Sequence, residues 1–161
     1  MSKQFSYNDP RRSKLAGQID FLRQTKVRLE NSLPNFRKRR LEYFESKLEY
    51  PAYLFGKNLT WVLVLKKSVA DAIKQSQGAV NRHATYLKRY ADRFDNISRG
   101  TWEMDIVGAY ENLARARLLL VAVDAETADA DELLATLDPV MRRAYALAAS
   151  AVNPDSFPFN G

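Results

Sequence analysis

"LTWVLVLKKSVADAIKQSQGAVNRHATYLKRYADRFDNI", residues 59–97, carries the spacing that decides the fold class. From position 69 onward, mostly apolar residues recur in alternating steps of four and three. This heptad spacing is typical of a long helix that packs along another helix. The positions are Val69, Ile73, Ser76, Val80, His83, Leu87, Tyr90, Phe94 and Ile97. We therefore expect a long central helix over about residues 60–98, ended by Gly100.

The beginning of this stretch leaves two interpretations open. Leu59–Leu65 contains Trp61, Val62 and Val64, whose side chains favour strands. A helix here would continue the central helix, whereas a lone strand has no obvious partner in the sequence. We expect a helix, with a strand as the alternative.

Shorter helices are expected on both sides of the central helix. On the N-terminal side they cover about residues 13–31 and 34–50, because Pro34 suits a first helical position and Pro51 disfavours helical geometry in the residue before it. In the second of these helices Leu41, Phe44 and Leu48 form the expected core stripe.

On the C-terminal side, Thr101 is a candidate N-cap for a helix that reaches about Val123. Its apolar positions are Val107, Tyr110, Ala114, Leu118 and Val121. A short helix over about 129–137 and a last helix over about 139–152 follow. The sequence thus predicts an all-α, single-domain bundle of five or six helices over residues 1–161, with an N-terminal arm (1–12) and a C-terminal tail (153–161).

The composition favours an ordinary globular protein. Apolar residues make up 46% and charged residues 27% of the 161 positions, and there is no Cys for disulfides or thiol chemistry. The N-terminus lacks the apolar segment of a signal peptide, and no apolar run approaches the roughly 20 residues of a membrane span. We expect a protein of the cytoplasm or of a virion or nucleoprotein particle, with no membrane contact.

Charge is distributed unevenly along the chain. Residues 1–100 contain 21 Lys and Arg against 9 Asp and Glu, a balance of +12, whereas residues 101–161 contain 4 against 10, a balance of −6. A basic half suggests nucleic acid or another polyanion as partner. Two halves of opposite charge on one chain also suggest a homo-oligomer with head-to-tail contacts. Alternatively, the halves neutralise each other within one monomer.

The run Arg37-Lys38-Arg39-Arg40 cannot face one partner, because four consecutive helical residues span 300°. One face of this expected helix nevertheless interleaves rings with cations, which suits base stacking and phosphate contact on a single strand. Alternatively, the rings pack on a neighbouring helix. The residues of this candidate nucleic-acid-binding face are Phe36, Arg39, Arg40, Tyr43, Lys47 and Tyr50.

The central helix offers a second candidate nucleic-acid-binding face. Its basic residues lie opposite the heptad positions within an arc of about 100°. The alternative is an ordinary solvated face of an amphipathic helix. The residues are Lys67, Lys74, Arg82, Arg89 and Arg93, with Tyr86 among them.

Catalytic and metal-binding patterns are missing from the sequence. His83 is the single His, no carboxylate stands four residues before or after it, and no nucleophile motif surrounds it. The acidic segment 124–132 lacks the Gly of a calcium loop. We expect a structural role for His83 and predict no enzyme activity, no cofactor and no metal.

The C-terminal tail contains Phe157 and Phe159 on either side of Pro158. Two exposed rings would be unfavourable on a monomer, so we expect them in an intersubunit contact, with docking on their own bundle as the alternative. Together these features predict a non-enzymatic helical assembly protein, such as a structural component of a virion or nucleoprotein. We expect its basic surface to bind single-stranded nucleic acid with low sequence specificity. The alternative is a helical adaptor that binds other proteins without contacting nucleic acid.

Overall fold

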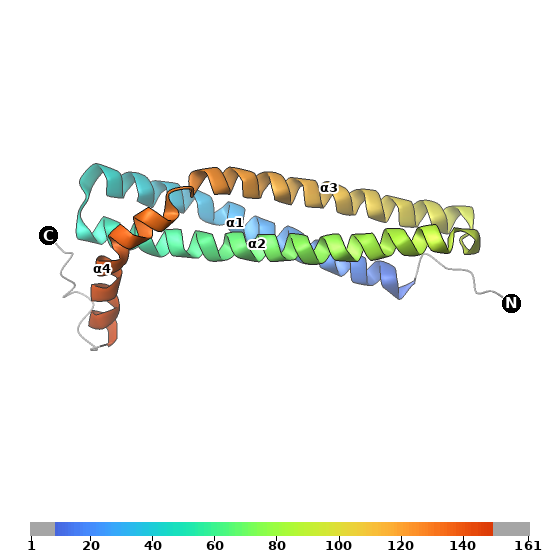
Figure 1. Cartoon of the computed structure of the whole chain (residues 1–161), viewed down its shortest axis with the longest axis horizontal. Coiled ribbons are helices and arrows are strands. Elements are labelled where there is room, and N and C mark those ends of the chain that lie inside the picture. The colour runs from blue at the N-terminus through green and yellow to red at the C-terminus, as the bar shows by residue number, and fades with distance from the viewer. Residues whose placement is uncertain (1–8, 150–161) are drawn as a thin grey trace. The chain divides into compact units, whose positions relative to one another are not determined.

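The computed structural model describes residues 9–149, and these residues form helices and no strand (Figure 1). The α-helices are α1 (Pro10–Ser46), α2 (Glu49–Arg89), α3 (Asn96–Glu126) and α4 (Ala130–Ala149), and a short 3₁₀ helix (Ala91–Arg93) separates α2 from α3. The all-α class is confirmed. The prediction of five or six helices is wrong, because the described residues form four α-helices.

Two prolines explain most of this difference. Pro34 lies inside α1 and Pro139 inside α4, so each joins two segments that we expected to be separate helices. A proline inside a helix costs about 3 kcal/mol. Buried apolar residues nevertheless continue at helical spacing across Pro34, at Leu29, Leu33 and Phe36. Burial of this continuous face offsets the missing hydrogen bond.

The long helix exists but its bounds differ from those expected. It begins at Glu49 rather than near residue 60, so the segment 59–65 is helical. Pro51 stands in its first turn, where backbone N–H groups make no hydrogen bond within the helix, so a proline costs none there. The helix ends at Arg89 rather than at Gly100, and α3 has its own start. There the Asp95 carboxylate accepts a hydrogen bond from the backbone N–H of Ser98 at 2.7 Å, as an N-cap does.

Contacts divide the chain into two compact units, and each is described by itself. The first unit contains residues 9–27 and 67–122, and the second contains residues 28–66 and 123–149 of the described chain. The prediction of a single domain stays a prediction.

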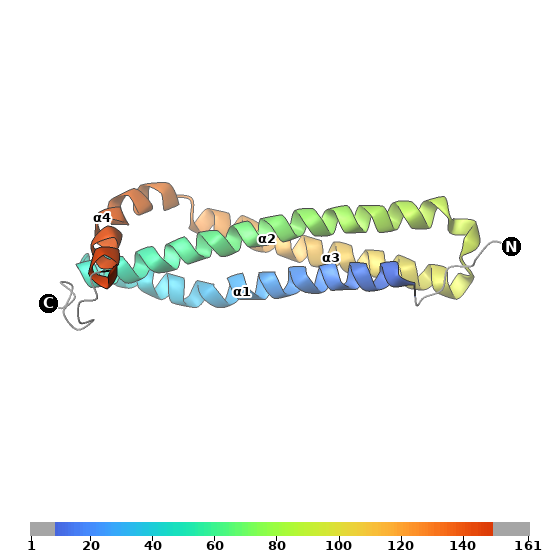
Figure 2. The same ribbon diagram turned by 90° about the horizontal axis from the view of Figure 1, so that it is seen from below.

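In the first unit, the beginning of α1, the last part of α2 and most of α3 lie side by side (Figures 1 and 2). The heptad positions from Val69 to Leu87 are buried, as predicted, and Trp102 of α3 is fully buried against them. The face of α3 that packs inward carries Trp102, Ala109, Leu113 and Ala116. The apolar positions expected to pack, including Val107, Leu118 and Val121, are exposed instead, as is Ile97.

In the second unit, Phe55 of α2 is the centre of an aromatic core. Its ring lies 5.9 Å from that of Phe36 and 5.6 Å from that of Tyr43. α4 packs on the beginning of α2, where Gly56 leaves room for Met141. The expected core stripe of Leu41, Phe44 and Leu48 is wrong, because all three side chains are exposed and the neighbouring side of α1, with Leu33 and Phe36, faces the core.

Candidate functional site

Four basic side chains line one exposed side of α2 in the first unit. Lys67, Lys74, Arg82 and Arg89 are all exposed, and at 100° per residue they lie within an arc of about 80°. We call these four residues the α2 basic face. One acidic residue, Asp71, stands between positions 67 and 89.

The side chains of the α2 basic face form no ion pair within residues 9–149. The ion pairs of the first unit involve other cations: Arg11 with Asp9, Arg12 with Asp105, and Arg99 with Glu103. Lys88 is a further exposed cation on the same stretch of α2, which the sequence analysis missed because it lies outside the arc. Arg93 lies beyond the end of α2, in the 3₁₀ helix, with its guanidinium carbon 5.0 Å from the centre of the Tyr90 ring.

Tyr86 lies beside the α2 basic face but its ring is already engaged. The Arg11 guanidinium carbon stands 3.8 Å from the ring centre, and the Tyr90 ring lies 4.7 Å away. The Asp9 carboxylate accepts hydrogen bonds from Arg11, which raises the pKa of Arg11 and lowers the pKa of Asp9. This fixed arrangement makes Tyr86 part of the packing rather than a free surface for a base.

A cavity of about 440 Å³ opens between α1 and α2 next to Tyr86. Its basic residues are Arg11 and Lys14 from α1 and Arg82 from α2, and no acidic side chain from the described part of the chain lines it. It therefore extends the positive surface from α2 onto α1. Lys14 was not among the predicted site residues, although its basic type at the start of a helix was visible in the sequence.

His83 and Trp102 form the floor of this cavity and are buried. Among residues 9–149, the His83 Nε2 and Trp102 Nε1 atoms have no hydrogen-bond partner, and Asp105 Oδ2 lies 3.9 Å from His83 Nε2. Burial lowers the pKa of His83, and the nearby Asp105 acts in the opposite direction. No group of His, Asp and Glu within residues 9–149 is arranged to hold a metal ion.

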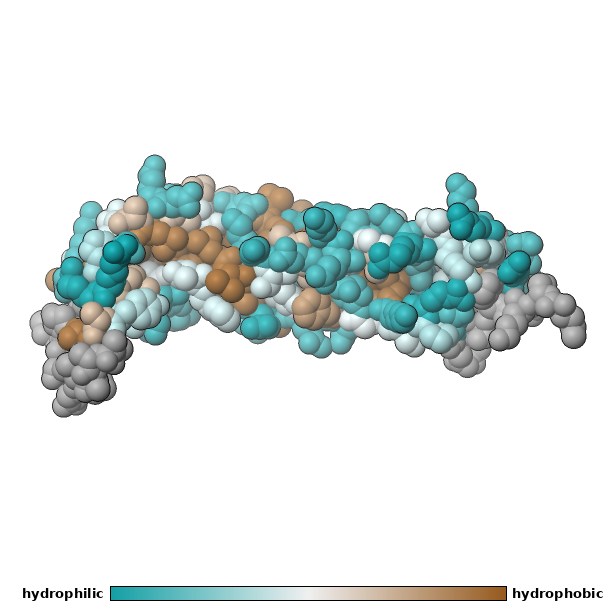
Figure 3. All heavy atoms as spheres, turned by 60° about the horizontal axis from the view of Figure 1, so that its bottom comes forward, coloured by the Kyte–Doolittle hydropathy of each residue, from teal (hydrophilic) through white to brown (hydrophobic). Residues whose placement is uncertain are grey.

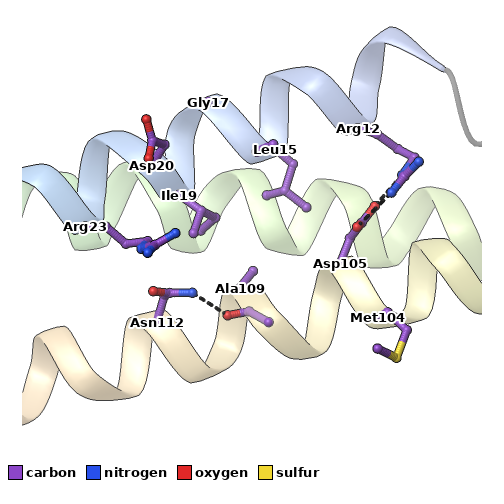
Figure 4. A pocket seen from close by; sticks show the side chains of 12 residues that line it. Arg12, Leu15, Gly17, Ile19, Asp20, Arg23, Met104, Asp105, Ala109 and Asn112 are labelled. Atoms are coloured by element: carbon purple, nitrogen blue, oxygen red, sulfur yellow. Dashed lines mark hydrogen bonds and ion pairs between the residues drawn. The ribbon is translucent and has the colours of Figure 1, made fainter.

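A second groove in the first unit, about 610 Å³, runs between α1 and α3. Figure 4 shows Arg12 of α1 and Asp105 of α3 pointing toward each other across it. Arg12 Nε donates to Asp105 Oδ2 at 2.6 Å, and this bond raises the pKa of Arg12. Asp20 and Arg23 also line the groove, so its charge is mixed and gives no preference for a polyanion.

The basic run of α1 lies in the second unit and is largely paired. Arg37 donates to both oxygens of Glu126 at 2.6 and 3.0 Å, which lowers the pKa of Glu126. Arg40 donates to the Glu126 backbone carbonyl and to Asp129. Arg39 pairs with Glu42 on its own helix. The guanidinium groups of Arg37 and Arg40 hold α1 to the segment that joins α3 and α4.

The aromatic residues predicted beside this run have different environments. Phe36 is 1% exposed, so its ring is not accessible to a base, and its assignment to a binding surface is corrected here. Tyr43 is half-buried and stacks on Phe55. Tyr50 is exposed in the first turn of α2. Lys47 has φ 55° and its N–H bonds to the Tyr43 carbonyl, so it ends α1 in a left-handed conformation.

The two candidate faces therefore belong to different units. Among residues 9–149, all four cations of the α2 basic face lack an ion pair, whereas Arg39 and Arg40 of the α1 face are paired. Phe157 and Phe159 lie outside the described residues. A search of the described helices for a segment that combines the length and apolarity of a membrane span found none. Comparison of the chain with protein-family models, with curated proteins and with solved structures found no match.

Proposed function

We propose that this chain is a non-enzymatic helical protein that binds nucleic acid through the α2 basic face, as a structural component of a nucleoprotein or virion would. The observation that carries the proposal is the exposure of Lys67, Lys74, Arg82 and Arg89 along about 33 Å of helix without an ion pair among the described residues. Cations without local partners are available to phosphates. Lys14, which lines the cavity together with Arg82, adds an exposed cation to the same surface.

The contact is made to phosphates rather than to bases. Phe36 is buried, Tyr43 stacks on Phe55, and Arg11 covers Tyr86. Backbone contacts carry no direct sequence information, so we expect low sequence specificity. A single strand is the preferred ligand because it can follow a line of cations on one helix, and a duplex of the same sequence serves as comparison.

The test is fluorescence anisotropy with labelled 30-nucleotide single strands of DNA and RNA of mixed sequence. Four phosphate contacts on a single strand predict a slope near −3 for the logarithm of the association constant against the logarithm of salt concentration, which is about a 50-fold loss of affinity between 50 and 200 mM salt. Arg82→Glu with Arg89→Glu should abolish most of the binding at 100 mM salt.

The matched control is Lys38→Glu with Lys57→Glu, two exposed residues of the second unit. This variant has the same net charge as the first, so a general effect of charge would weaken both equally. Stronger loss in the Arg82 and Arg89 variant supports the proposal. Equal losses, or no binding by the wild-type chain at 50 mM salt, would refute it.

A further inference from the structure

α3 has a second apolar face that points to solvent. Its positions alternate in steps of three and four over 25 residues, and all belong to the first unit. Five large apolar side chains on this face are between 55% and 77% exposed. We call these eight positions the outer face of α3: Ile97, Gly100, Met104, Val107, Glu111, Ala114, Leu118 and Val121.

The outer face lies opposite the face that packs in the core. At 100° per residue, its mean direction differs by about 160° from that of Trp102, Ala109 and Leu113. Scattered apolar residues are normal on a protein surface. The view in Figure 3 shows such apolar patches among polar residues. A heptad spacing sustained over about 36 Å is different, because it is the pattern by which one helix packs along another.

The charges beside the outer face fit a second copy of the same helix in the opposite direction. Glu103 precedes Met104, and Arg117 precedes Leu118, so both flank the same edge of the face. In an antiparallel pair, residues whose numbers add up to about 218 lie in the same layer, with Met104 against Ala114 of the second copy. Glu103 then faces Arg117 of the second copy, and the twofold axis repeats this pair.

A parallel pair fits less well. It would place Glu111 directly against Glu111 of the second copy in the apolar layer, which like charges disfavour. It would also leave Glu103 opposite Gly108, without a basic partner. In the antiparallel pair Glu111 faces Val107 instead, so the two Glu111 carboxylates lie in different layers.

We propose that the outer face of α3 binds the outer face of a second copy, antiparallel, to form a twofold-symmetric dimer. Such a contact is closed, since the same surface is used on both chains. It differs in kind from a head-to-tail contact between basic and acidic halves. The inference does not depend on nucleic-acid binding.

The test exchanges the two flanking charges. Within one chain Glu103 Oε1 lies 3.6 Å from Arg99 Nε in an exposed ion pair, and Arg117 donates a hydrogen bond to the Gln77 side chain of α2. The exchange therefore removes only surface contacts from the fold. Glu103→Arg alone and Arg117→Glu alone each place like charges opposite each other twice. Each should raise the dimer dissociation constant more than roughly tenfold in sedimentation velocity.

Two combinations restore the dimer only if it is antiparallel. The double variant Glu103→Arg with Arg117→Glu again has two pairs of opposite charge. A mixture of the two single variants should form mixed dimers, because each Arg of one chain then faces a Glu of the other. Leu118→Glu should disrupt the wild-type dimer, and Tyr145→Glu, at an exposed position of the second unit, should not.

Helical circular dichroism of every variant should match that of the wild type, since the changed side chains are exposed. The proposal is overturned if the wild-type chain is monomeric at about 100 μM. It is also overturned if the charge exchanges leave a dimer unchanged, which places the interface elsewhere. If the single variants weaken the dimer and neither combination restores it, the occupant is not an antiparallel copy.

Discussion

The imidazole of His83 lies flat on the indole of Trp102, with ring centroids 4.0 Å apart and ring planes 10° apart. Both residues are buried between α2 and α3 in the first unit. Burial disfavours the charged imidazolium, which lowers the pKa of His83. His83 is therefore neutral in the folded protein near pH 7.

Stability should depend on the protonation of His83. The unfolded chain takes up a proton near the ordinary pKa of about 6.5, whereas the folded chain does so only at lower pH. The free energy of unfolding should therefore be constant above about pH 7 and fall as the pH drops below 6.5. Urea unfolding between pH 7.5 and 5 measures this dependence.

The matched variant for this prediction is His83→Gln, which cannot titrate. Its unfolding free energy should vary less between pH 7.5 and 5, because the pKa values of Asp9 and Glu126 are lowered and these carboxylates lose their stabilising charge only in more acidic solution. The variant should be less stable than the wild type at pH 7.5 by at most about 2 kcal/mol. Equal pH dependence in both chains would show that His83 does not cause it.

Arg40 should stabilise the second unit. Its guanidinium donates to the Glu126 carbonyl and to Asp129, so Arg40→Ala leaves these acceptors without their partner. We expect a loss of about 1–3 kcal/mol in the free energy of unfolding. Lys38→Ala, an exposed neighbour in the same basic run, should change it by less than about 0.5 kcal/mol. Similar losses in the two variants would contradict the assigned role.

Phe55 should be essential to the aromatic core of the second unit. The ring is fully buried and contacts those of Phe36 and Tyr43, so Phe55→Ala should cost about 3–5 kcal/mol in chemical unfolding. Leu41→Ala tests the corrected face of α1, because Leu41 is 60% exposed and should contribute within about 0.5 kcal/mol. A large loss for Leu41→Ala would mean that the face first expected in the core is buried after all.

Two helical glycines should respond differently to alanine. A methyl group at Gly17 would meet no atom within 4 Å, so Gly17→Ala should stabilise α1 by about 1 kcal/mol through helix propensity. At Gly56 the added carbon would stand 2.8 Å from Met141 Sδ, and the Met141 side chain would have to shift. Gly56→Ala should therefore gain less than Gly17→Ala or lose stability, as thermal unfolding would show.

Local patterns in the sequence predicted the helices better than their ends. The heptad positions from Val69 to Leu87 are buried because helical spacing alone brings them to one side. α3 begins before the expected N-cap Thr101, because Asp95 caps it instead. Pro34 and Pro139 predict helix breaks, and burial on both sides of Pro34 shows that packing can outweigh the lost hydrogen bond.

The candidate site was predicted in part for the same reason. A line of cations on one helix is a property of its spacing, so the α2 basic face was visible in the sequence. The partners of Arg37 and Arg40 could not be predicted from the sequence, because Glu126 and Asp129 lie more than 80 positions away in the chain. An ion pair across such a separation depends on how helices are placed, which no local pattern contains.

The sequence by itself determined the helical class of this protein, the heptad face of its longest helix and the uneven distribution of its charge. Only the tertiary structure decided which apolar side of α3 is buried, because Trp102 and Leu118 lie on opposite sides of a helix that is apolar on both. Periodicity identifies the faces of a helix. Which of two apolar faces is buried depends on the volume and shape of the neighbouring helices. In this protein the outer face of α3 stays in contact with solvent.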